Sequence, residues 1–385
     1  MKGALMLGYK SLKSTPAWMC GSGTAHAAAV GRTTLRLLQL SNGARGYECR
    51  AAAEVAGTPL EDTTALAATP TVIGKTAADE LRARPFSGTS AAVTLPAELF
   101  ESDFARLPAR SDGELAESIR FEAMDRFSVS AESSCIGHVR LGATAGGSIE
   151  VLMLSVARDA VDRATRTLSR AGLAPVRVEH AGLAALRALS RQRAAECADP
   201  ADARDWCMLH LEDRAATLAM VRDGNLAFFR TVRGDWSPTA APAAPTHASG
   251  MTTMLRLADE PIPLEDPEAG PAGWRWCSLA EESLRCLRHF QRAASSWWPR
   301  AIVLTGPAAV DPQAAATIES VCGAPTALAV PIRLLEFPDA CIHGNAWVAA
   351  IGAACAGLPA LRPSGRSSTT AASPASRAKT TVAAA

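Results

Sequence analysis

The chain has 385 residues, of which 48% are hydrophobic, so it is long enough to bury a sizeable core in one large bilobed fold or in two or three ordinary domains. Because 39 basic residues are balanced by 38 acidic ones, the formal net charge of +1 provides no overall field that would favour nucleic acid or an anionic membrane. The longest apolar runs, such as 149–156, fall far short of the roughly 20 residues that cross a bilayer, which predicts a soluble protein.

The first part of the chain has a predicted order of leader, hairpin and strand. Residues 1–27 lack periodicity and are expected to form a disordered leader. Strands are predicted at 34–39 and 46–51, joined by an Asn-Gly turn whose residues tolerate positive φ. A further strand is predicted at 91–95.

An amphipathic helix is predicted at 112–127, with Phe121 and Phe127 among the apolar residues near helical spacing. The pattern then alternates between strands and helices, and the helix at 159–171 ends before Gly172, a residue type that suits a left-handed cap. The predicted order is strand, strand, helix, strand and helix at 134–141, 149–156, 159–171, 175–179 and 181–195. We therefore expect residues 112–180 to form an inserted α+β subdomain with its own small sheet.

The second half begins with another predicted antiparallel meander and continues with helices. Its strands are expected at 206–211, 216–222 and 226–232. A Pro/Ala-rich insert at 237–273 and a Pro/Ser/Thr/Ala tail at 359–385 cannot bury enough apolar surface to offset the entropy of ordering them. Between them the pattern predicts a long helix, a buried strand and two further helices at 278–294, 301–304, 312–322 and 347–356.

The two halves repeat one plan, because each opens with a strand-turn-strand and carries helices behind it. This duplication predicts an α/β, bilobed fold of the actin/Hsp70 (ribonuclease H-like) architecture, in which a nucleotide sits between two lobes. We expect the first lobe at 28–202, including the inserted subdomain, and the second lobe at 203–358.

Three segments of the first half carry a likeness to a known family: LPAELFESDFARLP at 95–108, ELAESIRFEAMDRFSVSAE at 114–132, and the segment at 151–189 that begins VLMLSVARDAVDRA. With the other segments over about 28–358, they resemble PilM, the actin-like ATPase family of type IV pilus assembly, with MshI and the cytoplasmic domain of type II secretion GspL as close relations. FFRTVRGDW, SLAEESLRCLRHFQ and AIVLTGPAAV resemble the second lobe. The order of these motifs, more than any single one, identifies the likeness.

The first phosphate hairpin of PilM-like proteins resembles D-x-G-S-S-x-x-K, and the matching stretch here reads AVGRTTLR, from Ala29 to Arg36. Gly31, Thr33 and Thr34 keep the small, hydrogen-bonding character, and Arg36 retains the charge of the lysine. The aspartate that would position Mg²⁺ is replaced by Ala29.

The second hairpin resembles D-x-G-x-x-x-T, and the matching stretch reads HLEDRAAT, ending at Thr217. His210 stands at the aspartate position and Glu212 at the glycine position. A carboxylate there repels phosphate oxygens, and its Cβ blocks the close approach that glycine permits, although Arg214 could partly offset the charge.

The adenosine-contacting Gly-Gly of the family corresponds to Gly306-Pro307, and proline removes an N–H and fixes φ. We thus expect a degenerate nucleotide cleft, at most weak ATP binding and no resident cofactor. Its candidate cofactor-binding residues are Gly31, Thr33, Thr34, Arg36, Thr217 and Gly306.

Plainer interpretations of these residues stay open. The polar residues near Thr34 and Arg36 suit either an anion site or an ordinary half-exposed strand, and an acidic turn at Glu212 is more often structural than metal-binding. Trp297 and Trp298 suit core packing or a partner contact. The ten cysteines are scattered singly along the chain, which indicates a protein of the reducing cytosol. Neither the ligand spacing of a zinc site nor a catalytic triad is recognisable, so we predict no metal site and no catalytic residue.

The resemblance and the replaced residues imply a cytoplasmic scaffold of a type IV pilus or type II secretion-like platform at the inner-membrane face. Its implied partner is the cytoplasmic N-terminal tail of a PilN-like inner-membrane protein, with no nucleic acid and no direct membrane insertion. The alternative is an active ATPase or small-molecule kinase of the same superfamily, which would need carboxylates in place of Ala29 and His210.

Overall fold

The computed structural model describes most of the two predicted lobes. The described residues are 8–9, 24–31, 34–42, 47–56, 70–143, 147–197, 199–236, 273–293, 297–329, 344–356 and 358. The predicted disordered tail at 359–385, nearly all of the insert at 237–273 and most of the predicted leader lie outside these residues.

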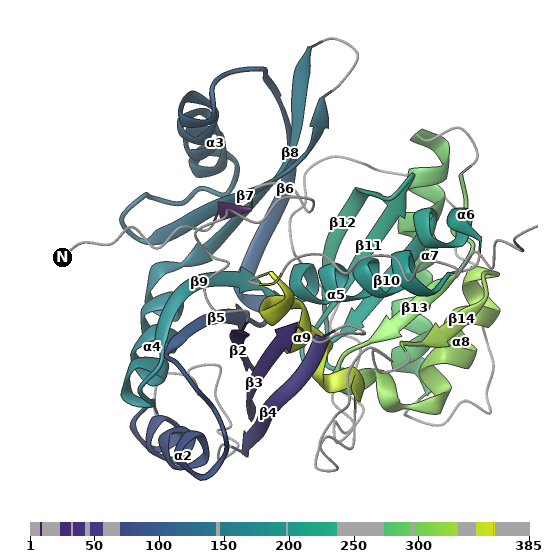
Figure 1. Ribbon diagram of the computed structural model, residues 1–385. Helices are drawn as coiled ribbons and strands as arrows, with labels where there is room; N and C mark the ends of the chain where they lie inside the picture. The colour runs from purple at the N-terminus through teal and green to yellow at the C-terminus, as the bar shows by residue number, and fades with distance from the viewer. Residues whose placement is uncertain are drawn as a thin grey trace, which may run out of the picture.

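The first lobe is built on a five-stranded sheet in the order β4-β3-β2-β5-β9 (Figure 1). Its helices α2 (Pro70–Ala83) and α4 (Arg158–Arg170) pack against each other. The strands are β2 (Thr24–Val30), β3 (Thr34–Asn42), β4 (Tyr47–Ala56), β5 (Ser90–Leu95) and β9 (Ala174–His180). The lobe therefore begins at Thr24, within the expected leader, and includes β9, which we expected in the inserted subdomain.

The second lobe repeats this sheet in the order β12-β11-β10-β13-β14. In both sheets the first three strands pair antiparallel, and the last two continue the sheet parallel to the third strand. Its strands are β10 (Trp206–Leu211), β11 (Ala215–Arg222), β12 (Asn225–Arg233), β13 (Ile302–Thr305) and β14 (Thr326–Leu328). Helices α7 (Gly273–Ala293) and α8 (Pro312–Cys322) pack together beside it. The repeated topology confirms the predicted α/β bilobed architecture.

A third sheet, in the order β1-β7-β8-β6, forms a separate subdomain with α3 (Asp112–Arg126). Its strands are β1 (Gly8–Tyr9), β6 (Phe100–Pro108), β7 (Ser134–Ala143) and β8 (Ser148–Ala157). The subdomain thus covers 100–157 with a short contribution from the expected leader, and the predicted bounds of 112–180 were placed too late. The strand β6 opens it, and the helix α4 and strand β9 return to the first lobe.

Helix α3 starts at a capping box, in which Ser111 accepts from the N–H of Glu114 while the Glu114 carboxylate accepts from the N–H of Ser111. Leu115, Ile119 and Ala123 pack into the small core of this subdomain. Phe121, which we grouped with these apolar residues, is 70% exposed. It lies two residues from Ile119, about 200° around the helix, so it points to the opposite side.

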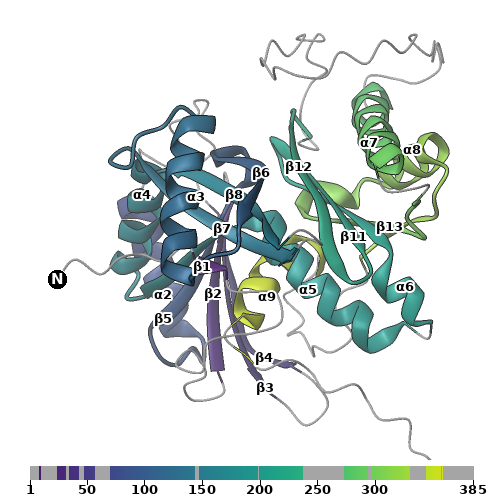
Figure 2. The same ribbon diagram turned by 90° about the horizontal axis from the view of Figure 1, so that it is seen from above.

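Two helices lie between the lobes, α5 (Ala181–Glu196) and α9 (Val348–Cys355) (Figure 2). They make extensive contact with each other, and α9 also packs on β2, β3 and β5. The last described helix therefore belongs with the first lobe's sheet and not with the second lobe, where we expected it. Short helices complete the connections: α6 (Pro200–Arg204) and the 3₁₀ turns η2 (Ala97–Leu99), η3 (Pro307–Val310) and η4 (Gly344–Trp347).

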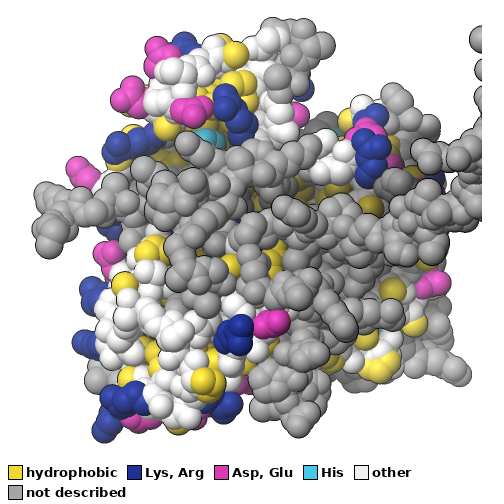
Figure 3. All heavy atoms as spheres, viewed as in Figure 1, with side chains coloured by type: hydrophobic (Ala, Val, Ile, Leu, Met, Phe, Trp, Pro, Cys, Tyr) yellow, Lys and Arg dark blue, Asp and Glu magenta, His cyan; other side chains and the backbone are white. Residues whose placement is uncertain are grey.

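The face of the molecule drawn in Figure 3 carries charges of both signs. On the face drawn in Figure 3, Lys and Arg side chains alternate with Asp and Glu side chains. Among the described helices, none is long and apolar enough to cross a membrane. Trp297 and Trp298 are half-buried against the core of the second lobe, and the Trp297 indole N–H donates to Asp205 at 3.1 Å, so this pair packs within its own lobe.

Candidate functional site

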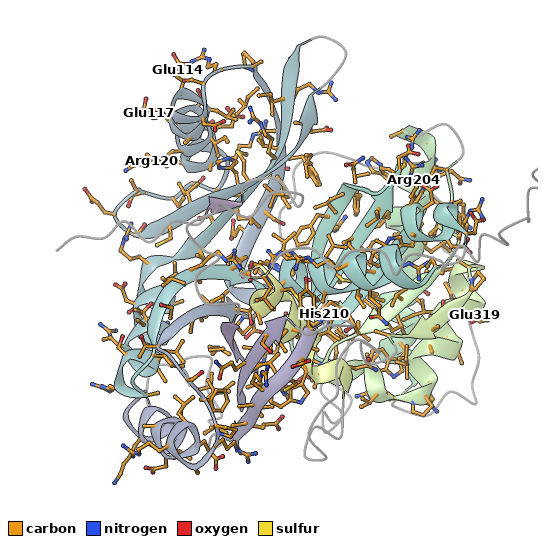
Figure 4. All side chains as sticks on the ribbon, viewed as in Figure 1. Glu114, Glu117, Arg120, Arg204, His210 and Glu319 are labelled. Atoms are coloured by element: carbon orange, nitrogen blue, oxygen red, sulfur yellow. The ribbon has the colours of Figure 1, made fainter. Side chains whose placement is uncertain are left out.

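The turns of two equivalent hairpins face one cavity between the lobes. One turn joins β2 to β3 and includes Gly31, and the other joins β10 to β11 at 212–214. The cavity has a volume of about 140 Å³ and is also lined by the N-terminus of α5, at Ala181, and by Pro307 and Ala349. Figure 4 shows His210 in this region, between the two halves of the ribbon. The hairpins predicted from the sequence are thus brought together.

Paired residues form a row across each sheet at the level of this cavity. In the first lobe the row runs through neighbouring strands as Glu54, Arg36, Ala29, Thr94 and Glu179. In the second lobe the equivalent row runs as Thr231, Thr217, His210 and Thr305. Ala29 lies on β2 and His210 on β10, which are the middle strands of the two equivalent sheets. The two residues therefore occupy equivalent positions in the two lobes. The motif resemblance in the sequence predicts that the same two residues occupy the aspartate positions of the family.

The predicted cofactor-binding residues divide into two groups. Gly31, Thr34 and Arg36 line the cavity, whereas Thr217 and Gly306 are not among its lining residues. Thr33 lies outside the described residues. Arg36 is held by a salt bridge to Glu54, with Nε and Oε2 2.8 Å apart, and its side chain is only 12% exposed. The structure therefore gives Arg36 a partner within its own sheet.

Thr217 and Gly306 serve packing contacts instead. The fully buried Thr217 lies under the first turn of α5, where a Cβ on Gly182 would come within 2.6 Å of the threonine hydroxyl oxygen. Gly306 has φ +100°, and a Cβ there would overlap the backbone of Leu211 at the end of β10. Glycine is thus required at 306 to let two backbones meet, a reason that the motif alone does not reveal.

Two buried histidines lie at the interlobe contact and are held neutral. His180 caps α5 by accepting from the N–H of Gly182 at 3.0 Å, and burial, with a smaller effect of His210, lowers the pKa of His180 to about 3. Burial lowers the pKa of His210 to about 4, and its Nδ1 has no hydrogen-bond partner among the described residues. His210 therefore serves as an uncharged polar group at neutral pH and cannot replace the charge of an aspartate.

Glu212 connects the two lobes directly. Its Oε2 accepts from the N–H of Ala97 in η2 at 2.8 Å, although 115 residues separate the two positions. Burial raises the pKa of Glu212 to about 8; the Ala97 N–H lowers it in part, and the nearby Glu98 and Asp213 raise it further. The Glu212 side chain thus lines the cavity from the second lobe while bonding to η2 of the first.

Three features of the cavity bear on whether it could hold a magnesium nucleotide. A cavity of about 140 Å³ is smaller than the roughly 300–1,000 Å³ of small-molecule sites. Ala29 supplies no oxygen, and His210 is neutral with a buried ring. Among the described residues, no group of three or more His, Cys, Asp or Glu side chains is arranged to hold a metal ion.

Comparison with known proteins decides the fold. No family model and no curated protein matches this chain. PilM from a PilM–PilN type IV pilus biogenesis complex superimposes with a TM-score of 0.67 at 18% sequence identity, covering 87% of this chain and 98% of that chain. The chain has the PilM fold, an actin-like ATPase fold.

Two further structures have lower similarity. One is the ethanolamine utilization protein EutJ from Carboxydothermus hydrogenoformans, with a TM-score of 0.45, 13% identity, and coverage of 86% of this chain and 89% of that chain. The other is the cytoplasmic domain of EpsL, an inner membrane component of the type II secretion system of Vibrio cholerae, with a TM-score of 0.40, 11% identity, and coverage of 82% and 86%.

Sequence reasoning missed three residues of the cleft. Thr94 lines the cavity with a buried hydroxyl that has no partner among the described residues, His180 caps α5, and Ala97 bonds to Glu212. Thr94 lies one residue before the end of the short apolar strand β5, so a polar residue at the end of that predicted strand was a usable signal. No local pattern marks Ala97, because its role depends on a residue in the other lobe.

Proposed function

We propose that this chain is a cytoplasmic assembly protein of a type IV pilus or type II secretion-like inner-membrane platform. It binds the cytoplasmic tail of a PilN-like membrane protein and has little or no ATPase activity. The observation that carries the proposal is the PilM fold over nearly the whole described chain, combined with a cleft whose polar groups bond to the protein itself: Glu212 accepts from Ala97 across the lobes, and Arg36 pairs with Glu54 within the first lobe.

The partner proposal rests on the first lobe and its subdomain. The similar PilM structure is part of a PilM–PilN complex, which motivates a PilN-like partner for this chain. The subdomain formed by β6, α3, β7 and β8 has its own core and presents sheet edges beside the first lobe. An extended peptide can bind such a surface through main-chain hydrogen bonds and a few apolar pockets, and this mode needs no nucleotide chemistry.

We expect the purified full-length chain to show no magnesium-dependent ATP hydrolysis and at most weak ATP affinity. The reason is that Ala29 and His210 offer no carboxylate for the metal and Glu212 narrows the cleft. Restoring the family residues with Ala29→Asp, His210→Asp and Glu212→Gly should raise ATP affinity, measured by calorimetry with and without Mg²⁺. Hydrolysis by the unaltered chain that needs Mg²⁺ would instead support the ATPase or kinase alternative.

Partner binding is tested with the full-length chain and a peptide of the cytoplasmic tail from the PilN-like protein of the same genome. A fragment ending at 202 is unsuitable, because α9 packs on β2, β3 and β5. We expect a complex on size exclusion and slowed hydrogen exchange in the first lobe and residues 100–157, with unchanged exchange in α7 and α8. A scrambled tail is the control. Protection confined to the second lobe, or no complex, would contradict the proposal.

A further inference from the structure

The hydrogen bond from the N–H of Ala97 to Glu212 is a direct contact across the cleft at the position where the family motif has glycine. Ala97 is fully buried at the start of η2, in the first lobe, and Glu212 follows β10 in the second. The turn that carries Glu212 is closed by a backbone hydrogen bond, in which the Glu212 N–H donates to the Ala215 carbonyl at 2.9 Å. A rigid turn in one lobe thus presents a carboxyl group to a backbone donor of the other.

Other contacts between the lobes lie close to this hydrogen bond. The His180 ring packs against Phe100 and Phe229, with centroids 4.9 and 5.1 Å away, and so joins the subdomain side of the first lobe to β12. His180 Nε2 also lies 3.4 Å from the hydroxyl of Thr231. Gly182 sits directly on Thr217. Together these contacts join the two lobes beside the cavity.

From this geometry we propose that Glu212 is an internal latch: its hydrogen bond to Ala97 holds the two lobes in the arrangement seen in the structure, which we call the closed state. The Glu212 side chain stands where the family motif has glycine and would leave room for a ligand. It is a positioning residue, since its effect is on the arrangement of the lobes. The latch acts within the cleft, so it does not depend on which partner binds the first lobe.

The charge environment makes this latch sensitive to pH. Burial favours the protonated carboxyl, and Glu98 and Asp213 oppose its ionisation. Because the pKa of Glu212 in the closed state, about 8, lies above the 4.5 of an exposed glutamate, closure is favoured at low pH and loses stability as the pH rises from about 4.5 to about 8. The charged and titratable groups that line the cavity with Glu212 are Arg36, Glu98, His210, Asp213 and Arg214. Arg233 of β12 also approaches, donating to the Glu98 carbonyl at 3.5 Å.

The test is hydrogen exchange at the Ala97 amide of the full-length chain, expressed as a protection factor at each pH from 6.5 to 9. At pH 6.5 we expect Glu212→Ala to lower this protection about tenfold, the effect of losing one such hydrogen bond. In the unaltered chain, protection should fall as the pH rises from 6.5 to about 8 and change little above it. Glu212→Gln should keep much of the protection and lose its pH dependence, since the amide oxygen still accepts but does not titrate.

Asp213→Asn is the matched control, because it changes a neighbouring carboxylate in the same turn and should leave the Ala97 protection at pH 6.5 unchanged. The two histidines titrate far below the tested range, so they do not contribute to it. The latch is refuted if Glu212→Gln keeps the pH dependence of the unaltered chain, or if Glu212→Ala protects Ala97 as well as the unaltered chain does. Should Glu212→Ala fail to fold, the pH comparison with Glu212→Gln decides the matter alone.

Discussion

Replacing Gly352 by alanine should destabilise the protein by about 3 kcal/mol or more. A Cβ at this position would overlap the carbonyl oxygen of Ala184, where α9 crosses α5. Both groups are backbone, so no side-chain rotation relieves the overlap and the two helices must move apart. That movement would also disturb the hydrogen bond from Arg187 Nη1 to the Gly352 carbonyl, which is 2.7 Å long.

Urea unfolding followed by circular dichroism measures this loss as a shift of the midpoint at constant slope. Gly113→Ala is the matched control, because an added Cβ there meets nothing within 4 Å and the residue lies in the first turn of α3. We expect that control to be neutral or slightly stabilising. A Gly352→Ala protein within about 0.5 kcal/mol of the original would contradict the close helix crossing.

Removing Arg187 should also have a large effect, because the side chain satisfies a fully buried carboxylate. Its two terminal nitrogens bind the two oxygens of Glu179 at 3.1 and 2.7 Å, and Arg177 approaches the same carboxylate at 3.3 Å. Arg187→Met would leave Glu179 with a weaker partner and the Gly352 carbonyl without its Arg187 bond. Breaking a buried pair from one side typically costs about 3–5 kcal/mol.

The double variant Glu179→Leu, Arg187→Met separates the charge effect from lost packing. Because no buried charge remains from this pair, we expect the double variant to be more stable than Arg187→Met alone. Arg285→Met is the control, since Arg285 pairs with Glu282 at 3.1 Å but is 71% exposed, and its loss should cost about 1 kcal/mol at most. If Arg187→Met and Arg285→Met unfold at the same urea concentration, the buried pair does not stabilise the fold as described.

The sequence by itself determined most regular elements of the two lobes. The Asp223-Gly224 turn between β11 and β12, the cap at Gly172 and the apolar strands β8, β10 and β13 follow from residue patterns within a few positions. The same patterns located the second cleft hairpin, whereas the first was placed only by the motif resemblance that also singled out Ala29, His210 and Glu212. These features are local, so neighbouring residues are sufficient to predict them.

Other features were decided only by the tertiary structure. Strand β2 reads TAHAAAV, and alanine is a poor strand former, so the segment is a strand because β3 and β5 pair with both its edges. Likewise β9 belongs to the first lobe because it pairs with β5, and α9 returns there because Gly352 lets it meet α5. The bond between Glu212 and Ala97 joins positions 115 residues apart. Pairing and close approach between distant segments depend on the three-dimensional arrangement, which no local pattern encodes.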